Sequence, residues 1–195
     1  ISGVFLAIVF NGLGISLLLI FLSESSPDYD NFVLILSVVV VAPIVEEFVK
    51  PIVMFRNASV RSNIDEVEDG LVYGAGFGLG FGATENVLYG LSEEAVTAGY
   101  LGILAVVVLR TVSSILLHLV ATSFTGHGIS KYLVEGQSFT VVVKYYFLAV
   151  LIHAAWNGAA VYSMIYTDNL GGVLVLIFSI MLAVGGLEFS KRRIR

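Results

Sequence analysis

The sequence predicts an all-α, polytopic membrane protein, built as a single bundle of about six transmembrane helices. Apolar residues make up 57% of the 195 residues and charged residues only 13%, whereas soluble domains carry about 25% charged residues. The chain also contains six mainly apolar runs of about the length that a spanning helix needs. All but two of its basic residues lie in or beside alternate connections or in the tail, as expected for a chain that crosses a membrane repeatedly.

The six expected helices cover residues 2–22, 32–55, 70–91, 101–124, 143–166 and 170–188. The polar stretches 56–69 and 125–142 are the only sizeable ones between them, and we find no linker or repeat. We therefore interpret residues 1–195 as one domain. The first run lacks a basic start and a small-residue cleavage site, which favours a spanning helix over a signal peptide. Because residue 1 is Ile, we expect a trimmed or processed start and allow for further helices before it.

Basic residues predict the orientation. Arg56 and Arg61 follow the second helix, Lys131 and Lys144 flank the loop before the fifth, and the tail carries four more, whereas the loops after the first, third and fifth helices carry none. The positive-inside rule then places both termini in the cytoplasm. The net charge of −5 gives no basic face for nucleic acid. The absence of cysteine excludes disulfides, thiolate metal sites and cysteine nucleophiles.

The second helix contains three charged residues in an apolar run, VVVVAPIVEEFVKPIVMF. One charge at the bilayer centre costs roughly 2.5–3.5 kcal/mol, so something must offset these. Glu46 and Lys50 have the spacing of a helical ion pair, and Glu47 points about 100° away from Glu46. Pro43 and Pro51 bracket them and favour a kink. Simple charge neutralisation for packing is the alternative interpretation, but it leaves Glu47 unexplained.

The third helix is rich in glycine. Its two series with four-residue spacing are Gly74, Gly78 and Gly82, and Gly76 and Gly80. Such series allow close helix approach. A phosphate-binding loop is the alternative, but it would need a preceding strand and a GK[ST] sequence. Glu85 and Asn86 follow directly. By residue count Glu85 lies nearer the outer side of the membrane than the other candidates, unless the helix extends past residue 91 through SEEAV.

The fourth helix carries Arg110 and His118, and the fifth carries His153 and Asn157 on one face. A lone histidine in an apolar helix is usually a core residue, but two histidines together with three intramembrane glutamates favour a site. The three glutamates, one lysine and one arginine leave one negative charge within the membrane. A protonated histidine or glutamate, or a bound cation, would balance it.

The ordered set EEFVK, FGATENVLY, Arg110 with His118, and HAAWN resembles the PrsW family of intramembrane proteases, within the superfamily of CAAX prenyl proteases and bacteriocin-processing proteins. The resemblance spans about residues 40–160. It implies hydrolysis of a peptide bond in a single-span, membrane-anchored substrate, such as an anti-sigma-type regulator, in a prokaryotic cell membrane. The implied partners are this substrate and the lipid bilayer, without nucleic acid.

The resemblance also implies roles for the polar residues. Glu46 would activate water, while His153 and Asn157 would polarise the scissile carbonyl and hold the oxyanion. Glu47 and His118 would complete the water-binding shell. Two further residues, Lys50 and Arg110, would act as counter-charges. Glu85 stays a catalytic candidate, although prenyl proteases carry histidine at the corresponding position of F-x-x-x-H.

Three alternatives remain open. The preferred scheme requires no cofactor, but Glu46, His118 and His153 could instead hold Zn²⁺, which lowers the pKa of bound water to about 7. The sequence lacks H-E-x-x-H, and a divalent cation would change the intramembrane charge from −1 to +1. A proton- or cation-coupled transporter also uses intramembrane charges, although we find no inverted repeat. The third alternative is a non-catalytic scaffold.

Overall fold

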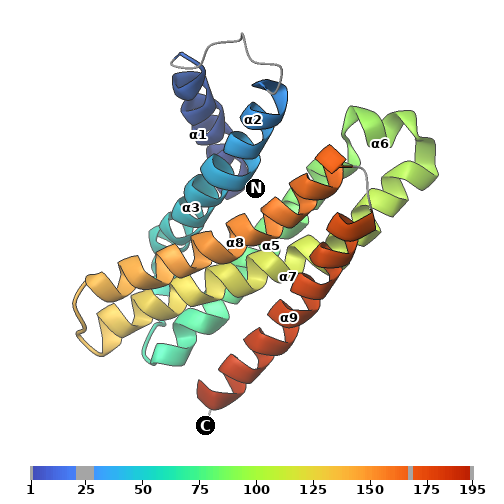
Figure 1. Ribbon diagram of the computed structural model, residues 1–195. Coiled ribbons are helices and arrows are strands. Elements are labelled where there is room, and N and C mark those ends of the chain that lie inside the picture. The colour runs from blue at the N-terminus through green and yellow to red at the C-terminus, as the bar shows by residue number, and fades with distance from the viewer. Residues whose placement is uncertain (1, 21–28, 167–168, 194–195) are drawn as a thin grey trace.

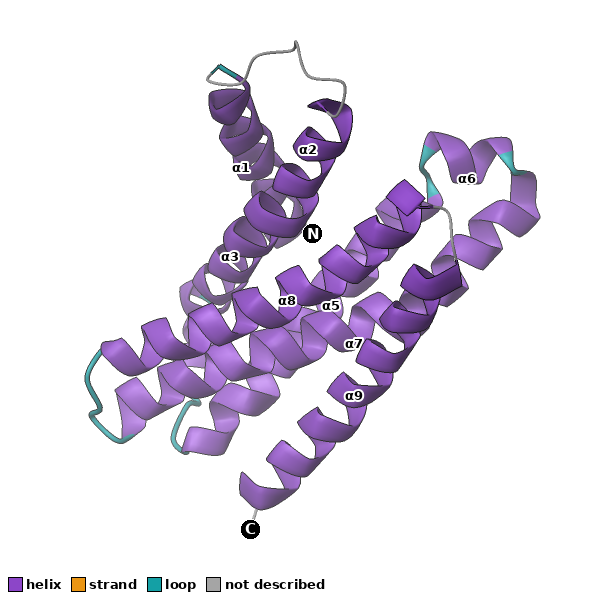
Figure 2. Cartoon of the chain, in the orientation of Figure 1, coloured by secondary structure: helices purple, strands orange, loops and turns teal. Residues whose placement is uncertain are grey.

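The computed structural model of the chain describes residues 2–20, 29–166 and 169–193. Within these ranges the regular structure is helical and contains no strand (Figure 2), so the predicted all-α class is confirmed. The elements are α1 (Ser2–Leu19), α2 (Tyr29–Ile35), the π-helix η1 (Leu36–Val41), α3 (Ala42–Arg56), α4 (Ala58–Arg61), α5 (Val67–Gly90), α6 (Glu93–Thr97), α7 (Gly99–Val134), α8 (Thr140–Tyr166) and α9 (Asn169–Arg193).

Each predicted helix has a counterpart in the structure. Helix α1 corresponds to the predicted helix 2–22, whose residues 21 and 22 lie outside the described ranges. The elements α2, η1 and α3 follow one another without a break and correspond to 32–55. The other four predicted helices correspond to α5, α7, α8 and α9. In Figure 1, α5, α7 and α8 run alongside one another, α9 lies along α7 and α8, and α1 packs on α3 at the other side of the bundle.

Helix α7 is much longer than predicted. We expected it to end at residue 124 and be followed by a polar loop, but it continues to Val134 and buries Thr125, His127 and Ser130. The polar residues of this turn are buried against neighbouring helices, so the end of the apolar run does not mark the end of the helix. The helix stops just before Gly136, whose φ of 66° is in the left-handed region that glycine adopts readily.

Helix α5 starts before residue 70, where the predicted helix begins, and ends before residue 91, where the predicted helix ends. Its start at Val67 is stabilised by Asp69, whose Oδ2 accepts the backbone N–H of Glu66 at 2.8 Å, as in a capping box. The helix ends at Gly90, and the short helix α6 follows as a separate element. The possible extension of one continuous helix through SEEAV is therefore wrong.

One glycine series of α5 forms its contact with α7. A Cβ atom at Gly74 would lie 2.5 Å from the carbonyl oxygen of Thr122, and one at Gly78 would overlap the carbonyl of His118. The close approach predicted for Gly74, Gly78 and Gly82 is confirmed, since Gly82 also faces His118. The prediction for the second series was wrong: Cβ atoms at positions 76 and 80 would meet nothing within 4 Å, because these positions lie on another face of α5.

The second helix contains the π-helix η1 just before Pro43, while the kink expected at Pro43 and Pro51 stays a prediction. Within it, the backbone N–H of Ala42 donates to the carbonyl of Ser37, five residues earlier, which is the hydrogen-bond pattern of a π-helix. Pro43 follows at the start of α3, whereas Pro51 lies inside α3 without ending it. The change in backbone hydrogen bonding thus lies about one helical turn before the two glutamates.

Four described helical segments are long and apolar enough to cross a membrane, namely Ser2–Leu19, Tyr29–Arg56, Gly99–Val134 and Thr140–Tyr166. Large apolar side chains are widely exposed on them: Leu101 is 75% exposed and Leu151 is 66% exposed. Apolar surface on this scale requires lipid or another protein, and we conclude that the chain is an integral membrane protein. Helices α5 and α9 do not satisfy the same length and hydropathy criteria over their described residues, so six spans and the cytoplasmic termini stay predictions.

Candidate functional site

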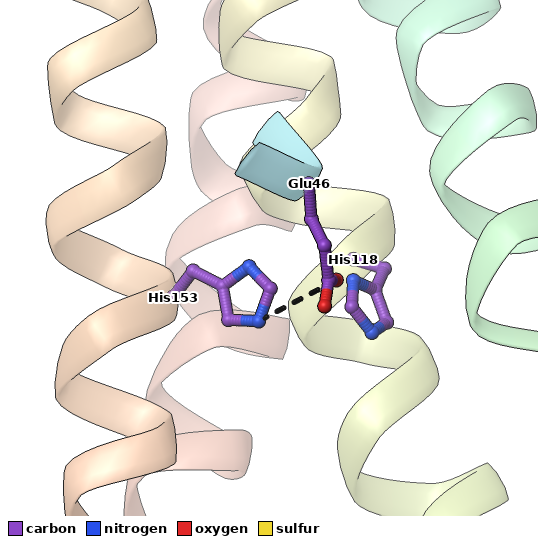
Figure 3. A group of neighbouring side chains, drawn as sticks. All are labelled: Glu46, His118 and His153. Atoms are coloured by element: carbon purple, nitrogen blue, oxygen red, sulfur yellow. Dashed lines mark ion pairs between the residues drawn. The ribbon is translucent and has the colours of Figure 1, made fainter. Parts of the chain in front are cut away.

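Three side chains from three helices converge inside the bundle. Glu46 comes from α3, His118 from α7 and His153 from α8, and Figure 3 shows them pointing toward one another. One carboxylate oxygen and one ring nitrogen from each histidine all lie within 4.8 Å of one another. All three residues are buried. Residues far apart in the sequence thus form one buried polar cluster.

Glu47 lies beneath this cluster and is fully buried, with 0% exposure. Its Oε1 atom lies 2.6 Å from Nζ of Lys50 and accepts a hydrogen bond from Nδ1 of His153 at 2.8 Å. Its Oε2 atom accepts a weaker hydrogen bond, at 3.4 Å, from the hydroxyl of Thr122. Both carboxylate oxygens are therefore engaged by protein groups, which suits Glu47 for orienting His153.

The ion pair of Lys50 differs from the expectation. The i, i+4 spacing predicted Glu46 as its partner, but Nζ of Lys50 lies 2.6 Å from Glu47 and 3.8 Å from Glu46. The lysine side chain also reaches α7, where Nζ lies 2.8 Å from Nδ1 of His118. This second contact draws the ammonium group across the helix face, and spacing within one helix could not reveal it.

Glu46 is left as the carboxylate without a close partner. Its Oε2 atom is buried and makes no hydrogen bond. The nearest ionisable groups are Lys50 Nζ at 3.8 Å and His153 Nε2 at 3.9 Å. A buried carboxylate oxygen that lacks a partner loses free energy unless water, a proton or a ligand satisfies it. This atom is thus the open position of the cluster.

Glu85 lies beside His118, in spite of its position near the end of α5. Its Oε2 atom lies 3.0 Å from Nε2 of His118 and 2.7 Å from Nη2 of Arg110. Arg110 also donates to Asn86 and Ser114, at 3.2 Å each, and its guanidinium carbon lies 3.6 Å from the centre of the Tyr89 ring. Residue counting placed Glu85 nearer the outer side of the membrane than His118, and that placement was wrong. Gly78 and Gly82 of α5 pack against α7 at His118, which brings Glu85 to the level of this histidine.

The hydrogen bonds assign the protons of both imidazoles. A lysine ammonium group only donates, so Nδ1 of His118 accepts from Lys50 and its Nε2–H donates to Glu85. In His153 the Nδ1–H group donates to Glu47, and Nε2 is directed toward Glu46. His118 is neutral in this arrangement, and the neutral form of His153 has its lone pair on Nε2. His153 presents a proton acceptor to the open position, whereas both ring nitrogens of His118 are occupied.

Asn157 lies one turn after His153 on α8, as predicted. Its Nδ2 atom donates a hydrogen bond of 2.7 Å to the carbonyl oxygen of Val38 in η1. The amide thus binds the backbone of the second span. Its assignment to an oxyanion stays a prediction from sequence.

The cluster lines a cavity of about 620 Å³ between α1, the second span, α5, α7 and α8. Its polar lining includes Glu46, His118 and His153 together with Glu85, Arg110, Asn157, Asn11, Ser37, Ser92 and Ser114. Apolar residues of α1 and α2, among them Val4, Ile8 and Leu34, line the rest. A polar group at the wall of a mainly apolar cavity is typical of a ligand or substrate site.

The sequence reasoning missed several polar residues of this site, among them two on α7. Thr122 donates to Glu47, and Ser114 accepts from Arg110. They lie four residues after and four residues before His118, which is the spacing of one helix face. That spacing was the available signal, but hydroxyl residues are common in membrane helices and do not stand out by type.

The donor set fits a metal ion only in part. His153 suits it, since a carboxylate holds its Nδ1–H and leaves Nε2 free, as is usual for metal-bound histidine. Glu46 also suits it, because its Oε2 is unpartnered. His118 does not, because Lys50 and Glu85 engage its two nitrogens. An ion bound by all three residues would have to displace one of those partners.

Comparisons with known proteins show the family of the chain. The family model described as PrsW family intramembrane metalloprotease matches residues 1–184. Protease PrsW of Clostridioides difficile (strain 630) is 32% identical over 143 residues, which cover 73% of this chain and 58% of that protein. The chain thus spans less than two thirds of the length of this relative. No solved structure matches it. The family match extends over nearly the whole chain, and the chain belongs to the PrsW family.

Proposed function

We propose that this chain hydrolyses a peptide bond of a membrane-anchored protein, with a water molecule activated by Glu46. The observation that carries the proposal is the buried, unpartnered Oε2 of Glu46, 3.9 Å from Nε2 of His153 at the wall of the cavity. A water molecule can lie within hydrogen-bond distance of two acceptors separated in this way. Membership in a family described as intramembrane proteases supports the same activity.

The charges around the site support Glu46 as the base. Lys50 pairs with Glu47 and Arg110 pairs with Glu85, so the two cations offset two of the three glutamates. Glu46 keeps only the more distant contact with Lys50, at 3.8 Å. A carboxylate without a close counter-ion, in a site of low dielectric constant, gains most from accepting a proton.

The reaction then proceeds through the two acceptors. Glu46 removes a proton from the water as the oxygen adds to the carbonyl carbon of the substrate. When the C–N bond breaks, a proton passes to the leaving amine. His153 can carry such a proton on Nε2, because Glu47 stabilises the resulting imidazolium through Nδ1–H. Glu47 thereby acts as a positioning residue, since it does not reach the cavity wall.

The surroundings of the site support one class of substrate. The catalytic candidates lie inside the bundle, on helices with lipid-exposed apolar faces, and the cavity is lined mainly by apolar residues. A substrate segment that reaches Glu46 must therefore be stable within or beside the membrane. We infer a single-span protein, of the kind represented by an anti-sigma-type regulator, in a prokaryotic cell membrane.

A zinc-dependent protease is the second candidate, favoured by the cluster of three donors and by the description of the family as metalloproteases. Glu46, His118 and His153 would hold the ion, which would supply Lewis acidity and lower the pKa of bound water. The engaged nitrogens of His118 make this scheme less favourable than a metal-free one, because the lysine ammonium group already occupies the position of a cation beside Nδ1.

The proposal is tested by reconstituting the chain in liposomes with a single-span substrate and measuring cleavage together with proton flux. We expect cleavage by the unchanged chain and its loss in Glu46→Gln, which preserves the size of the side chain. Glu135→Gln, at an exposed glutamate paired with Lys131, is the matched control and should cleave normally. Normal cleavage by Glu46→Gln would refute the role of Glu46. Proton flux without cleavage would instead indicate a transporter.

A further inference from the structure

The end of the π-helix η1 changes the hydrogen bonding of the Val38 carbonyl. The N–H of Ala42 donates to Ser37, five residues earlier. The next hydrogen bond in this pattern would join residue 43 to Val38, but residue 43 is proline, which has no N–H. The carbonyl of Val38 therefore cannot accept a hydrogen bond from residue 43, which any residue other than proline could donate in this pattern.

The side chain of Asn157 supplies the missing donor. Its Nδ2 atom lies 2.7 Å from the carbonyl oxygen of Val38, and its side chain is buried, with the residue only 9% exposed. In the interior of a membrane protein, a backbone carbonyl without a partner is strongly unfavourable. The hydrogen bond from α8 therefore stabilises a backbone geometry that the second span could not maintain by its own hydrogen bonds.

This contact joins the two helices that carry the open position of the site. Pro43 lies three residues before Glu46, within the same helical turn, and Asn157 lies one turn after His153. Nearby, a Cβ atom at Gly158 would lie 3.7 Å from a side-chain methyl of Val39, so α8 packs against η1 here. In the same region Oε2 of Glu46, on the helix that continues from η1, lies 3.9 Å from Nε2 of His153 on α8.

We propose that Asn157 is a positioning residue, which holds the carbonyl orphaned by Pro43 and thereby places Glu46 opposite His153. The inference rests on the proposed function for its catalytic consequence, whereas the helix contact itself is independent of it. It assigns the Nδ2 group of Asn157 a backbone partner instead of the oxyanion predicted from sequence. Pro43 and Asn157 form one unit, in which each residue requires the other.

A rescue experiment distinguishes these two roles. Pro43→Ala restores an N–H that can donate to Val38, so Asn157 is no longer needed there. We expect Asn157→Ala to lower kcat by roughly 10- to 100-fold, the range for lost supporting hydrogen bonds, with little change in KM. The double variant should return to within about threefold of Pro43→Ala alone. If Asn157 instead holds the oxyanion, the double variant will stay as slow as Asn157→Ala, which would overturn the proposal.

Pro51→Ala is the matched control. It also replaces a proline of the same helix, but its new N–H lies too far along the chain to reach Val38, so it should not rescue Asn157→Ala. Should Asn157→Ala lower the yield of folded protein, recovery of that yield by Pro43→Ala but not by Pro51→Ala is the same test at the level of stability. Rescue by both prolines would contradict the specific link to Val38.

A second measurement does not depend on activity. The chain contains no cysteine, so spin labels can be attached at single introduced cysteines, for example at the exposed positions Ile35 of α2 and Leu151 of α8. We expect Asn157→Ala to broaden the distance distribution between the labels and Pro43→Ala to narrow it again. An unchanged distribution in Asn157→Ala would overturn the proposal even if cleavage fails. The expected broadening without any cleavage would refute only the proposed function.

Discussion

Nδ1 of His153 lies 2.8 Å from Oε1 of Glu47, and the same carboxylate oxygen lies 2.6 Å from Nζ of Lys50. One atom of a fully buried glutamate thus orients a histidine and neutralises a lysine. This sharing explains why two consecutive glutamates occur at membrane depth. Glu47 supports the site through its hydrogen bonds, and Glu46 remains available to the cavity.

Replacement of Glu47 by glutamine should test the support that this residue gives to His153. The amide keeps the size of the side chain but removes the charge that stabilises a proton on His153. We expect kcat to fall by roughly 10- to 100-fold, the range found when a supporting partner of a functional histidine is lost, with KM nearly unchanged. Steady-state cleavage in liposomes measures both constants. Thr122→Val removes only the longer hydrogen bond to Glu47, and an equally large loss in this variant would contradict the assignment.

Lys50→Met should strongly destabilise the fold. Removal of one partner from a buried ion pair costs about 3–5 kcal/mol, because the other charge stays buried without compensation. The second substitution Glu47→Gln removes that charge, so the double variant should be less destabilised than the sum of both single variants. Thermal unfolding in detergent measures the three values. Additive losses would show that Lys50 and Glu47 do not form a coupled pair.

The glycine contact between α5 and α7 gives a prediction with internal controls. Gly78→Ala places a Cβ atom against the carbonyl of His118, so α5 must move away from α7 and carry Glu85 with it. We expect lower stability and a clear loss of cleavage. Gly76→Ala and Gly80→Ala meet nothing within 4 Å and should be neutral or stabilising by about 0.5–1 kcal/mol, the helical advantage of alanine. Equal effects at all three positions would contradict the contact.

The sequence predicts that a helix exists more reliably than it predicts where the helix ends. Each spanning run of apolar residues became a helix, because backbone groups in lipid must bond within their own segment. Their ends were less predictable: α7 continues through Thr125, His127 and Ser130, which are polar but buried. Hydropathy reports where a segment stops being apolar, whereas a helix ends where its backbone loses partners or meets a residue such as Gly136.

The candidate site shows a similar division. Residue type and depth singled out Glu46, Glu47, Glu85, His118 and His153, because ionisable groups are costly in a membrane and are retained for a purpose. The partner of each group depends on contacts between helices. The sequence therefore could not show that Lys50 reaches His118, or that Asn157 donates to Val38.

Removal of metal ions should leave cleavage intact. In the preferred scheme the cation beside His118 is the ammonium group of Lys50, at 2.8 Å from Nδ1, so no divalent ion is required. We expect unchanged kcat after prolonged treatment with a strong chelator and no stoichiometric zinc by elemental analysis. A known zinc protease treated in parallel is the control. Loss of cleavage that added Zn²⁺ restores would instead support a metal site at Glu46, His118 and His153.

The central claim is that Glu46 and His153 act on one water molecule, and the most direct measurement is kcat for Glu46→Gln, His153→Gln and the double variant on the same single-span substrate. Residues that act as a unit are strongly non-additive. We predict that each single variant lowers kcat by at least about 100-fold and that the double variant is no slower than the worse single one. Losses that multiply in the double variant, or normal cleavage by Glu46→Gln, would contradict the account.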